Sequence, residues 1–214
     1  MNWLTRLLPT RGDTPALDDE LRTRLQAWQA LAEPDLGRPH FEAAYTVLNT
    51  EATGLDLDKD TMLAVGAIRV DGGRFSPADG YYAPLSGQPA AALAGLLHFV
   101  GKGPVVVFNT GFNRVMLERA LATHLDVAPT WQWLDLRVLL PALFPERIDR
   151  PARLADWMRA FSIETFQRHH ALGDCWAIAQ LFLAAQSRAM AQGAAHARAL
   201  GDLERARRQL WRQP

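Results

Sequence analysis

Apolar residues recur with two different periods along this chain, and the two periods predict where strands and helices lie. Short apolar runs predict five strands, at residues 44–49, 62–70, 74–82, 104–108 and 131–134. Apolar positions three and four residues apart predict helices at residues 17–31, 93–100, 113–124, 135–144, 151–161, 171–192 and 195–211. This order predicts an α/β fold with one mixed five-stranded sheet flanked by helices.

Two of the predicted strands carry a clear topological signal. Asp71-Gly72-Gly73 lies between the runs at 62–70 and 74–82, which favours a hairpin and antiparallel neighbours. The run at 104–108 is continuously apolar, as is typical of a strand buried on both faces. We divide the chain into an N-terminal helical extension (1–43), a central domain (44–192) and a C-terminal helix (193–214).

The end of the first predicted strand presents oxygen-bearing side chains. Asn49 and Glu51 are two residues apart, so they project to the same side of a strand, and the turn-forming pair Thr53-Gly54 follows them. Open α/β sheets bind ligands at the carboxyl ends of their strands. Two acids here would form half of a metal site, but only Glu51 is acidic.

Composition narrows the functional classes. The chain is 49% hydrophobic and 21% charged, with a formal net charge of +0, which argues against a strongly basic coat for nucleic acid. Lys59 and Lys102 are the only lysines, and we attribute the excess of arginine to codon usage. The single cysteine, Cys175, allows no internal disulfide and favours the cytoplasm. No apolar run has the length of a membrane span.

Three segments, in order, resemble the motifs of the DEDDh 3′–5′ exonucleases. Residues 49–55, Asn-Thr-Glu-Ala-Thr-Gly-Leu, are similar to the motif Asp-x-Glu-x-Thr-Gly-Leu. Residues 108–113, Phe-Asn-Thr-Gly-Phe-Asn, are similar to His-Asn-x-x-Phe-Asp, and His169 is followed five residues later by Asp174. The resemblance covers residues 45–185. This part of the chain is similar to the proofreading epsilon subunit of bacterial DNA polymerase III. The resemblance implies a ribonuclease-H-like fold, two divalent metal ions and release of nucleoside monophosphates from 3′ ends.

The resemblance also assigns roles to residues. It implies metal binding by Glu51 and Asp174 and a catalytic role for His169 as general base. It further implies substrate contacts, from Thr53, Gly54, Leu55, Asn109 and Phe112. Simpler interpretations stay open at this stage. Glu51 could be a surface acid, Asp174 could stabilise a helix N-terminus, His169 could cap that helix, Asn109 could fix its loop, and Leu55 and Phe112 could pack in the core.

The motifs depart from the family at two metal-ligand positions. Asn49 and Asn113 stand where the family has acids, so four carboxylates become two. Each lost carboxylate is worth ~2–4 kcal/mol of metal binding after a heavy discount for solvation. We therefore expect one weak Mg²⁺ or Mn²⁺ site rather than two.

Two functional hypotheses follow. The first is a 3′–5′ exonuclease-family protein that acts on or binds single-stranded DNA or RNA 3′ ends or a nucleotide, with weak or lost activity. The second is a non-catalytic module that uses the same scaffold to bind nucleic acid, a nucleotide or a protein partner.

Overall fold

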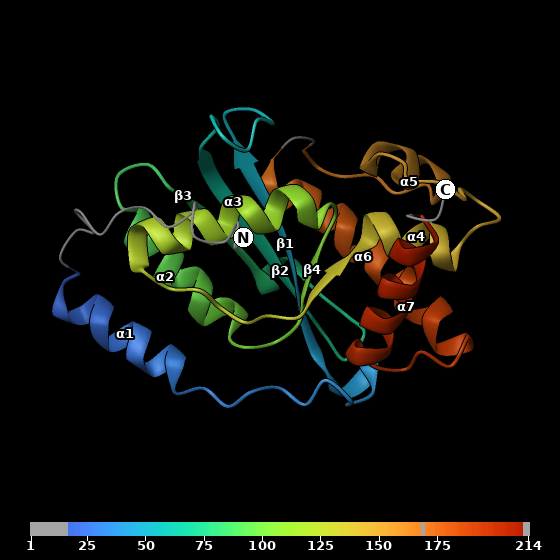
Figure 1. Cartoon of the computed structure of the whole chain (residues 1–214), viewed down its shortest axis with the longest axis horizontal. Coiled ribbons are helices and arrows are strands. Elements are labelled where there is room, and N and C mark those ends of the chain that lie inside the picture. Colours follow the sequence, from blue (N-terminus) through green and yellow to red (C-terminus); the bar gives the residue numbers. More distant parts are fainter. Residues whose placement is uncertain (1–16, 168–169, 212–214) are drawn as a thin grey trace, which may run out of the picture.

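One mixed five-stranded sheet forms the centre of the molecule, in the order β3-β2-β1-β4-β5 (Figure 1). A computed structural model describes residues 17–167 and 170–211 of the 214-residue chain, so the predicted base His169 lies outside the described residues. The strands are β1 (Ala44–Ala52), β2 (Met62–Asp71), β3 (Gly80–Pro84), β4 (Val105–Val107) and β5 (Trp133–Asp135). β1 runs antiparallel to β2 and parallel to β4, β3 is antiparallel to β2, and β5 is parallel to β4. The predicted mixed sheet is confirmed.

Helices cover both faces of this sheet. They are α1 (Asp19–Gln29), α2 (Pro89–Val100), α3 (Thr110–Leu125), α4 (Leu136–Leu143), α5 (Leu154–Ala160), α6 (Ala171–Ala191) and α7 (Ala197–Leu210). Short 3₁₀ turns lie at η2 (His40–Glu42) and η3 (Pro77–Asp79). Figure 1 shows α4 to α7 gathered on one side of the sheet, with α1 and α2 on the other.

Alternation along β1 divides the interior into two cores. Tyr45 and Val47 pack with α4, α6 and α7, whereas Leu48 packs with α1, α2 and α3. Because successive side chains point to opposite faces of a strand, Asn49 and Glu51 follow Val47 toward the α6 side. Thr50 follows Leu48 toward α3. The alternation therefore fixes which helix each polar side chain of β1 meets.

Several predicted boundaries are wrong, among them those of the first strand, the third strand and α3. β1 continues to Ala52, so Asn49 and Glu51 lie within the strand and not at a frayed end, and its register shifts only between Glu51 and Ala52. The third strand begins at Gly80 instead of residue 74, since Ser76 and Asp79 form a reciprocal capping box around the η3 turn. α3 begins at Thr110 instead of residue 113.

The N-terminus of α6 crosses β2 in backbone contact at Gly66. A Cβ atom at this position would lie 2.6 Å from the carbonyl carbon of Ala171 and 2.6 Å from the Leu172 nitrogen. The Cys175 thiol donates to the Gly66 carbonyl oxygen at 3.2 Å. Gly66 is paired with Asn49 across the β1–β2 ladder, so this crossing brings α6 to the functional end of β1.

Gly66→Ala is expected to lower the free energy of unfolding by about 1–3 kcal/mol, because backbone atoms on both sides must separate to admit the methyl group. Urea denaturation followed by circular dichroism measures the loss. Gly103→Ala is a matched control, since its Cβ would meet its nearest neighbour, the Ala44 carbonyl oxygen, at 3.4 Å. Equal stability of the two variants would contradict the close crossing.

A buried histidine joins the N-terminal segment to the chain near residue 194. His40 is 2% exposed. Its Nε2 lies 3.0 Å from the Ala194 carbonyl oxygen, and its Nδ1 lies 2.6 Å from the Tyr45 hydroxyl. The carbonyl oxygen can only accept, so Nε2 carries the proton and Nδ1 accepts from Tyr45. Burial lowers the pKa of His40 below its usual 6.5, with the neighbouring His196 acting in the same direction.

This contact is expected to make folding less stable as the pH falls. The unfolded chain binds the proton more readily than the folded one, so stability is complete above pH 6.5 and declines below it, by at most about 1.4 kcal/mol per pH unit. Urea midpoints at several pH values between neutral and mildly acidic conditions measure this. His40→Asn should flatten the pH dependence; a slope unaltered in this variant would rule the contact out as its source.

None of the described helices combines the length and the apolar character needed to cross a membrane.

Candidate functional site

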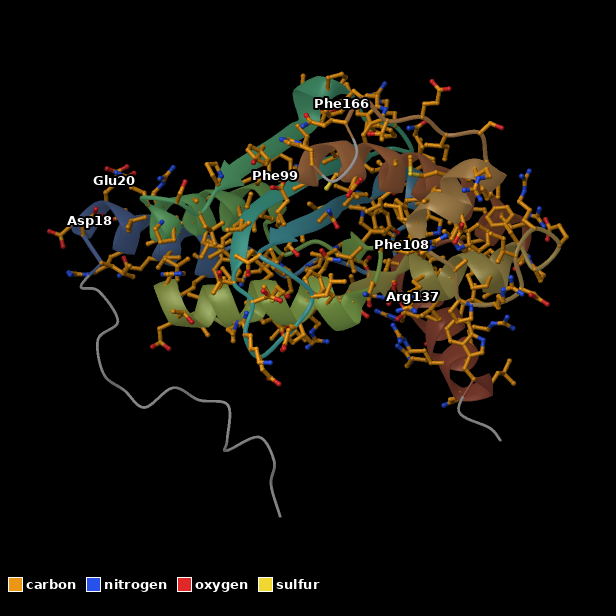
Figure 2. All side chains as sticks on the ribbon, turned by 90° about the horizontal axis from the view of Figure 1, so that it is seen from above. Asp18, Glu20, Phe99, Phe108, Arg137 and Phe166 are labelled. Carbon is orange, nitrogen blue, oxygen red and sulfur yellow. The ribbon has the colours of Figure 1, made fainter. Side chains whose placement is uncertain are left out.

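A cleft of about 1040 Å³ opens where the carboxyl ends of β1 and β4 meet the segment from α4 to α5. One wall carries Asn49, Thr50, Phe108 and Asn113 from the sheet side, and Asp174 of α6 joins them. The facing wall comes from residues 145–160. Figure 2 shows Phe108 and Arg137, which both line the cleft, at the end of the molecule away from Asp18 and Glu20 of the α1 region. The cleft thus occupies the position expected for ligands of α/β sheets.

The structure brings together three of the predicted motif residues. Asn49, Glu51 and Asp174 line one hollow of about 280 Å³ beside the main cleft. Glu51 accepts a hydrogen bond from the Ala171 backbone nitrogen at 2.6 Å, which ties β1 to the first turn of α6. Asp174 lies on that same turn and is half-buried. Segments 120 residues apart in sequence therefore converge on one site.

Asn113 also reaches this end of the sheet, but its side chain is fully occupied. Its Oδ1 accepts from the Thr50 nitrogen at 2.8 Å and from the Thr50 hydroxyl at 3.0 Å. Its Nδ2 donates to the carbonyl oxygens of Phe108 at 3.0 Å and Asn109 at 3.3 Å. The donors and acceptors fix the orientation of the amide, which is 3% exposed. Asn113 therefore works as a clamp between β1 and the turn that follows β4.

The buried carboxylate of Asp135 holds the turn that follows β4 by hydrogen bonds to its backbone. Asp135 accepts from the backbone nitrogens of Asn109 at 2.9 Å and Thr110 at 3.0 Å, and from Arg208 at 2.9 Å. Glu204 accepts from the Asp135 nitrogen at 2.8 Å and from Arg208 Nε at 2.9 Å. Burial raises the pKa of Glu204, while these two hydrogen bonds act in the opposite direction.

This network explains the early start of α3 and connects it to α7. Asn109 has φ 80°, a left-handed conformation that asparagine tolerates better than most residues, and the backbone bonds to Asp135 stabilise it. Arg208 of α7 joins the network, because it pairs with Asp135 and Glu204.

The predicted substrate-contact residues divide into two groups. Leu55, Asn109 and Phe112 line the main cleft, and Gly54 lines the smaller hollow. Leu55 is 84% exposed, so core packing of this residue is wrong. Thr53 is absent from the described lining of both, and its hydroxyl donates to Asp60 at 2.7 Å and accepts from the Thr61 nitrogen.

The residues that the structure describes do not fit a two-metal centre. Among residues 17–167 and 170–211, no group of three or more His, Cys, Asp or Glu side chains could hold a metal ion. Both acceptor positions of the Asn113 carbonyl are used by Thr50, so this amide offers no ligand in place of the family's acid. Hard divalent ions require several anionic oxygens, and Glu51 and Asp174 are the acids that remain near Asn49.

Electrostatic effects at this end of the sheet come from burial and from these acids. Burial raises the pKa of the Cys175 thiol well above its usual range, and the charge of Asp174 acts in the same direction. Burial raises the pKa of Tyr82, with a further contribution from Glu51. Tyr82 also stacks on His170, with ring centroids 4.6 Å apart.

Sequence reasoning missed the arginines of the facing wall. Five line the cleft, and they are Arg137, Arg147, Arg150, Arg153 and Arg159. The signal was present, because all five fall within residues 137–159, but it was assigned to codon usage. Only the fold shows that an α4–α5 segment lies opposite the motif residues.

Comparisons with solved structures place this architecture among known nuclease folds. The chain is similar to E. coli exonuclease I in complex with a dT13 oligonucleotide, with a TM-score of 0.50 and 17% identity over 70% of this chain and 42% of that one. The zinc-bound E. coli exonuclease I–single-stranded DNA complex has a TM-score of 0.51 and 18% identity, over 69% of this chain and 41% of that one. Exonuclease I in complex with the inhibitor BCBP has a TM-score of 0.56 and 18% identity, over 75% of this chain and 43% of that one.

These matches show the fold and no more. The similarity spans less than half the length of the exonuclease I chains. No family model and no curated protein sequence matches the chain. The ribonuclease-H-like fold expected from the sequence motifs is confirmed, whereas the resemblance to the epsilon subunit stays a prediction.

Proposed function

We propose that this chain binds single-stranded nucleic-acid 3′ ends in the cleft between β1 and α5, and that its 3′–5′ exonuclease activity is weak or lost. The observation that carries the proposal is the convergence of all three motif segments on one cleft, with Asn49 and Asn113 at two of the four positions that the family motif gives to acids. The exonuclease I structures bound to dT13 and single-stranded DNA support the ligand class.

The geometry supports loss of cleavage more directly than loss of binding. Two-metal catalysis needs a pair of cations that stabilises both the attacking and the leaving oxygen. Glu51 is held by the Ala171 backbone, and Asn113 is consumed by Thr50, Phe108 and Asn109, so the second cation has no anionic support. The cleft itself stays open and lined by polar and apolar groups. We further propose that the protein works in the cytoplasm, as a relative of the epsilon-type exonucleases.

The test is digestion and binding of one labelled oligothymidylate by the full chain, with Mg²⁺ and with Mn²⁺. We expect the oligonucleotide to be retained at full length and to shift in a binding assay. Metal-dependent shortening that Glu51→Ala abolishes would show that catalysis is intact. Absence of both shortening and binding, for oligothymidylate and for oligouridylate, would contradict the proposal as a whole.

A further inference from the structure

The cleft wall opposite the motif residues carries an excess of positive charge. Five arginines and three aspartates line the cleft, whereas the whole chain has a net charge of +0. In a two-metal nuclease cleft the protein supplies acidic side chains, which bind metal ions, and the metal ions bind the phosphates. Here the positive charge belongs to the protein itself.

Most of this charge is available to a ligand. Arg153 and Arg159 share a single acid, Asp156, at 3.3 Å and 3.5 Å. Arg137 and Arg150 are exposed, and neither side chain forms an ion pair with any residue in the described part of the chain. An unpaired guanidinium in a cleft is a strong donor for phosphate oxygens, which it binds through two parallel N–H groups.

Two of these arginines, Arg137 and Arg147, are positioned by contacts with folded elements. The Arg137 backbone nitrogen donates to Asp135 at 3.0 Å, so the first turn of α4 is capped by the same carboxylate that holds the turn at Asn109. Arg147 packs over the Phe161 ring at 4.3 Å and donates to the Ala160 carbonyl oxygen, which joins the 145–153 segment to the end of α5. The arginine wall is therefore a feature of the fold, set against the sheet.

The remaining lining favours nucleic acid over other anions. Phe112 is half-buried and Leu55 is 84% exposed at the same cleft, so bases have apolar surface on which to pack. The volume, about 1040 Å³, lies just above the ~300–1,000 Å³ typical of small-molecule pockets and suits an extended ligand. A stack of bases on one side and guanidinium groups along the phosphates is the usual arrangement for single strands.

We infer that this cleft binds the phosphate backbone of single-stranded nucleic acid through its arginines, without a divalent metal ion. The inference rests on the proposed function and adds the residues that bind and the independence from metal. Arg137 and Arg150 contribute most, because they are exposed and form no ion pair with another described residue. In place of the cations that the family uses, guanidinium groups neutralise the phosphates.

The experiment is fluorescence anisotropy with a 5′-labelled oligothymidylate in EDTA, repeated with Mg²⁺ and with Mn²⁺ over a range of salt concentrations. Wild-type protein is expected to bind equally well in EDTA and with metal. Arg137→Gln/Arg150→Gln is expected to weaken binding about ten- to hundredfold. It should also reduce the slope of log affinity against log salt by about 1.4, since each phosphate contact with a single strand contributes ~0.7.

The matched control is Arg24→Gln/Arg74→Gln. Both control arginines are exposed, and neither lines the cleft. Arg24 lies on α1, and Arg74 follows the Asp71 end of β2, which pairs with the start of β1. Circular dichroism verifies that both double variants fold. The control should bind as wild type does.

Failure of the inference and failure of the proposed function give different results. Binding that requires metal, or that survives unchanged in Arg137→Gln/Arg150→Gln, would overturn the inference and leave nucleic-acid binding in place. Equal displacement of the oligonucleotide by a short poly-glutamate peptide would overturn it in favour of an acidic protein partner. No binding of oligothymidylate or oligouridylate under any condition would overturn both.

Discussion

Replacing Asn113 by aspartate is expected to destabilise the protein by about 3–5 kcal/mol at neutral pH, because it leaves an uncompensated charge in a buried site. One carboxylate oxygen would keep the hydrogen bonds from Thr50. The other would face the carbonyl oxygens of Phe108 and Asn109, which can only accept. Asn113→Asp therefore restores the sequence of the family motif but destabilises this fold.

The pH dependence of this variant has a definite sign. Burial and the two carbonyl oxygens raise the pKa of the new carboxyl in the folded state, so folding requires its protonated form. The stability deficit should be largest at neutral pH and shrink as the pH falls toward mildly acidic values. Urea denaturation at both ends of this range measures it. Asn109→Asp is the matched control, since Asn109 is half-buried with no hydrogen bond to its side chain among the described residues; a wild-type midpoint for Asn113→Asp would contradict the clamp.

Asn49→Asp is expected to raise Mn²⁺ affinity by two or three powers of ten and still give no trimming of single-stranded DNA. The new carboxylate joins Glu51 and Asp174 in one hollow, and each carboxylate is worth ~2–4 kcal/mol of cation binding. One improved cation does not replace a pair, because both the attacking and the leaving oxygen need stabilisation. Calorimetric titration measures the affinity, and the oligothymidylate assay measures trimming.

The outcome for Asn49→Asp shows whether position 49 alone, or position 113 as well, accounts for the expected lack of cleavage. Efficient trimming by this single variant would show that Asn49 alone blocks catalysis and that Asn113 is no obstacle. Asn49→Ser, which keeps a polar neutral side chain, is the control for changes in packing and should bind Mn²⁺ no better than wild type.

Periodicity and motif order were enough to predict the sheet and its helices. The apolar run at Tyr45 and Val47 and the continuous run at Val105–Val107 become the buried central strands β1 and β4, since apolar alternation is decided by the need to bury each face. Boundaries depended on individual side chains. η3 replaces the first half of the expected third strand because Ser76 and Asp79 cap each other, and α3 starts early because Asp135 binds the Asn109 and Thr110 nitrogens.

The site was predictable in part. Motif spacing placed Asn49, Glu51 and Asp174, which the fold brings into one hollow. The full hydrogen bonding of the Asn113 side chain could not be predicted from the sequence. Its four hydrogen bonds join three segments, and no local sequence pattern specifies how those segments pack. The arginine wall was missed for the same reason. Arg137 and Arg150 look like ordinary surface residues until the α4–α5 segment is placed opposite β1.

The central claim is that this cleft offers fixed positive charge in place of a pair of metal ions. Electron paramagnetic resonance of free Mn²⁺, titrated with the wild-type protein, counts bound ions directly. The account predicts fewer than one ion bound per chain at micromolar Mn²⁺. Two ions bound per chain at that concentration, with both lost in Glu51→Ala, would contradict it.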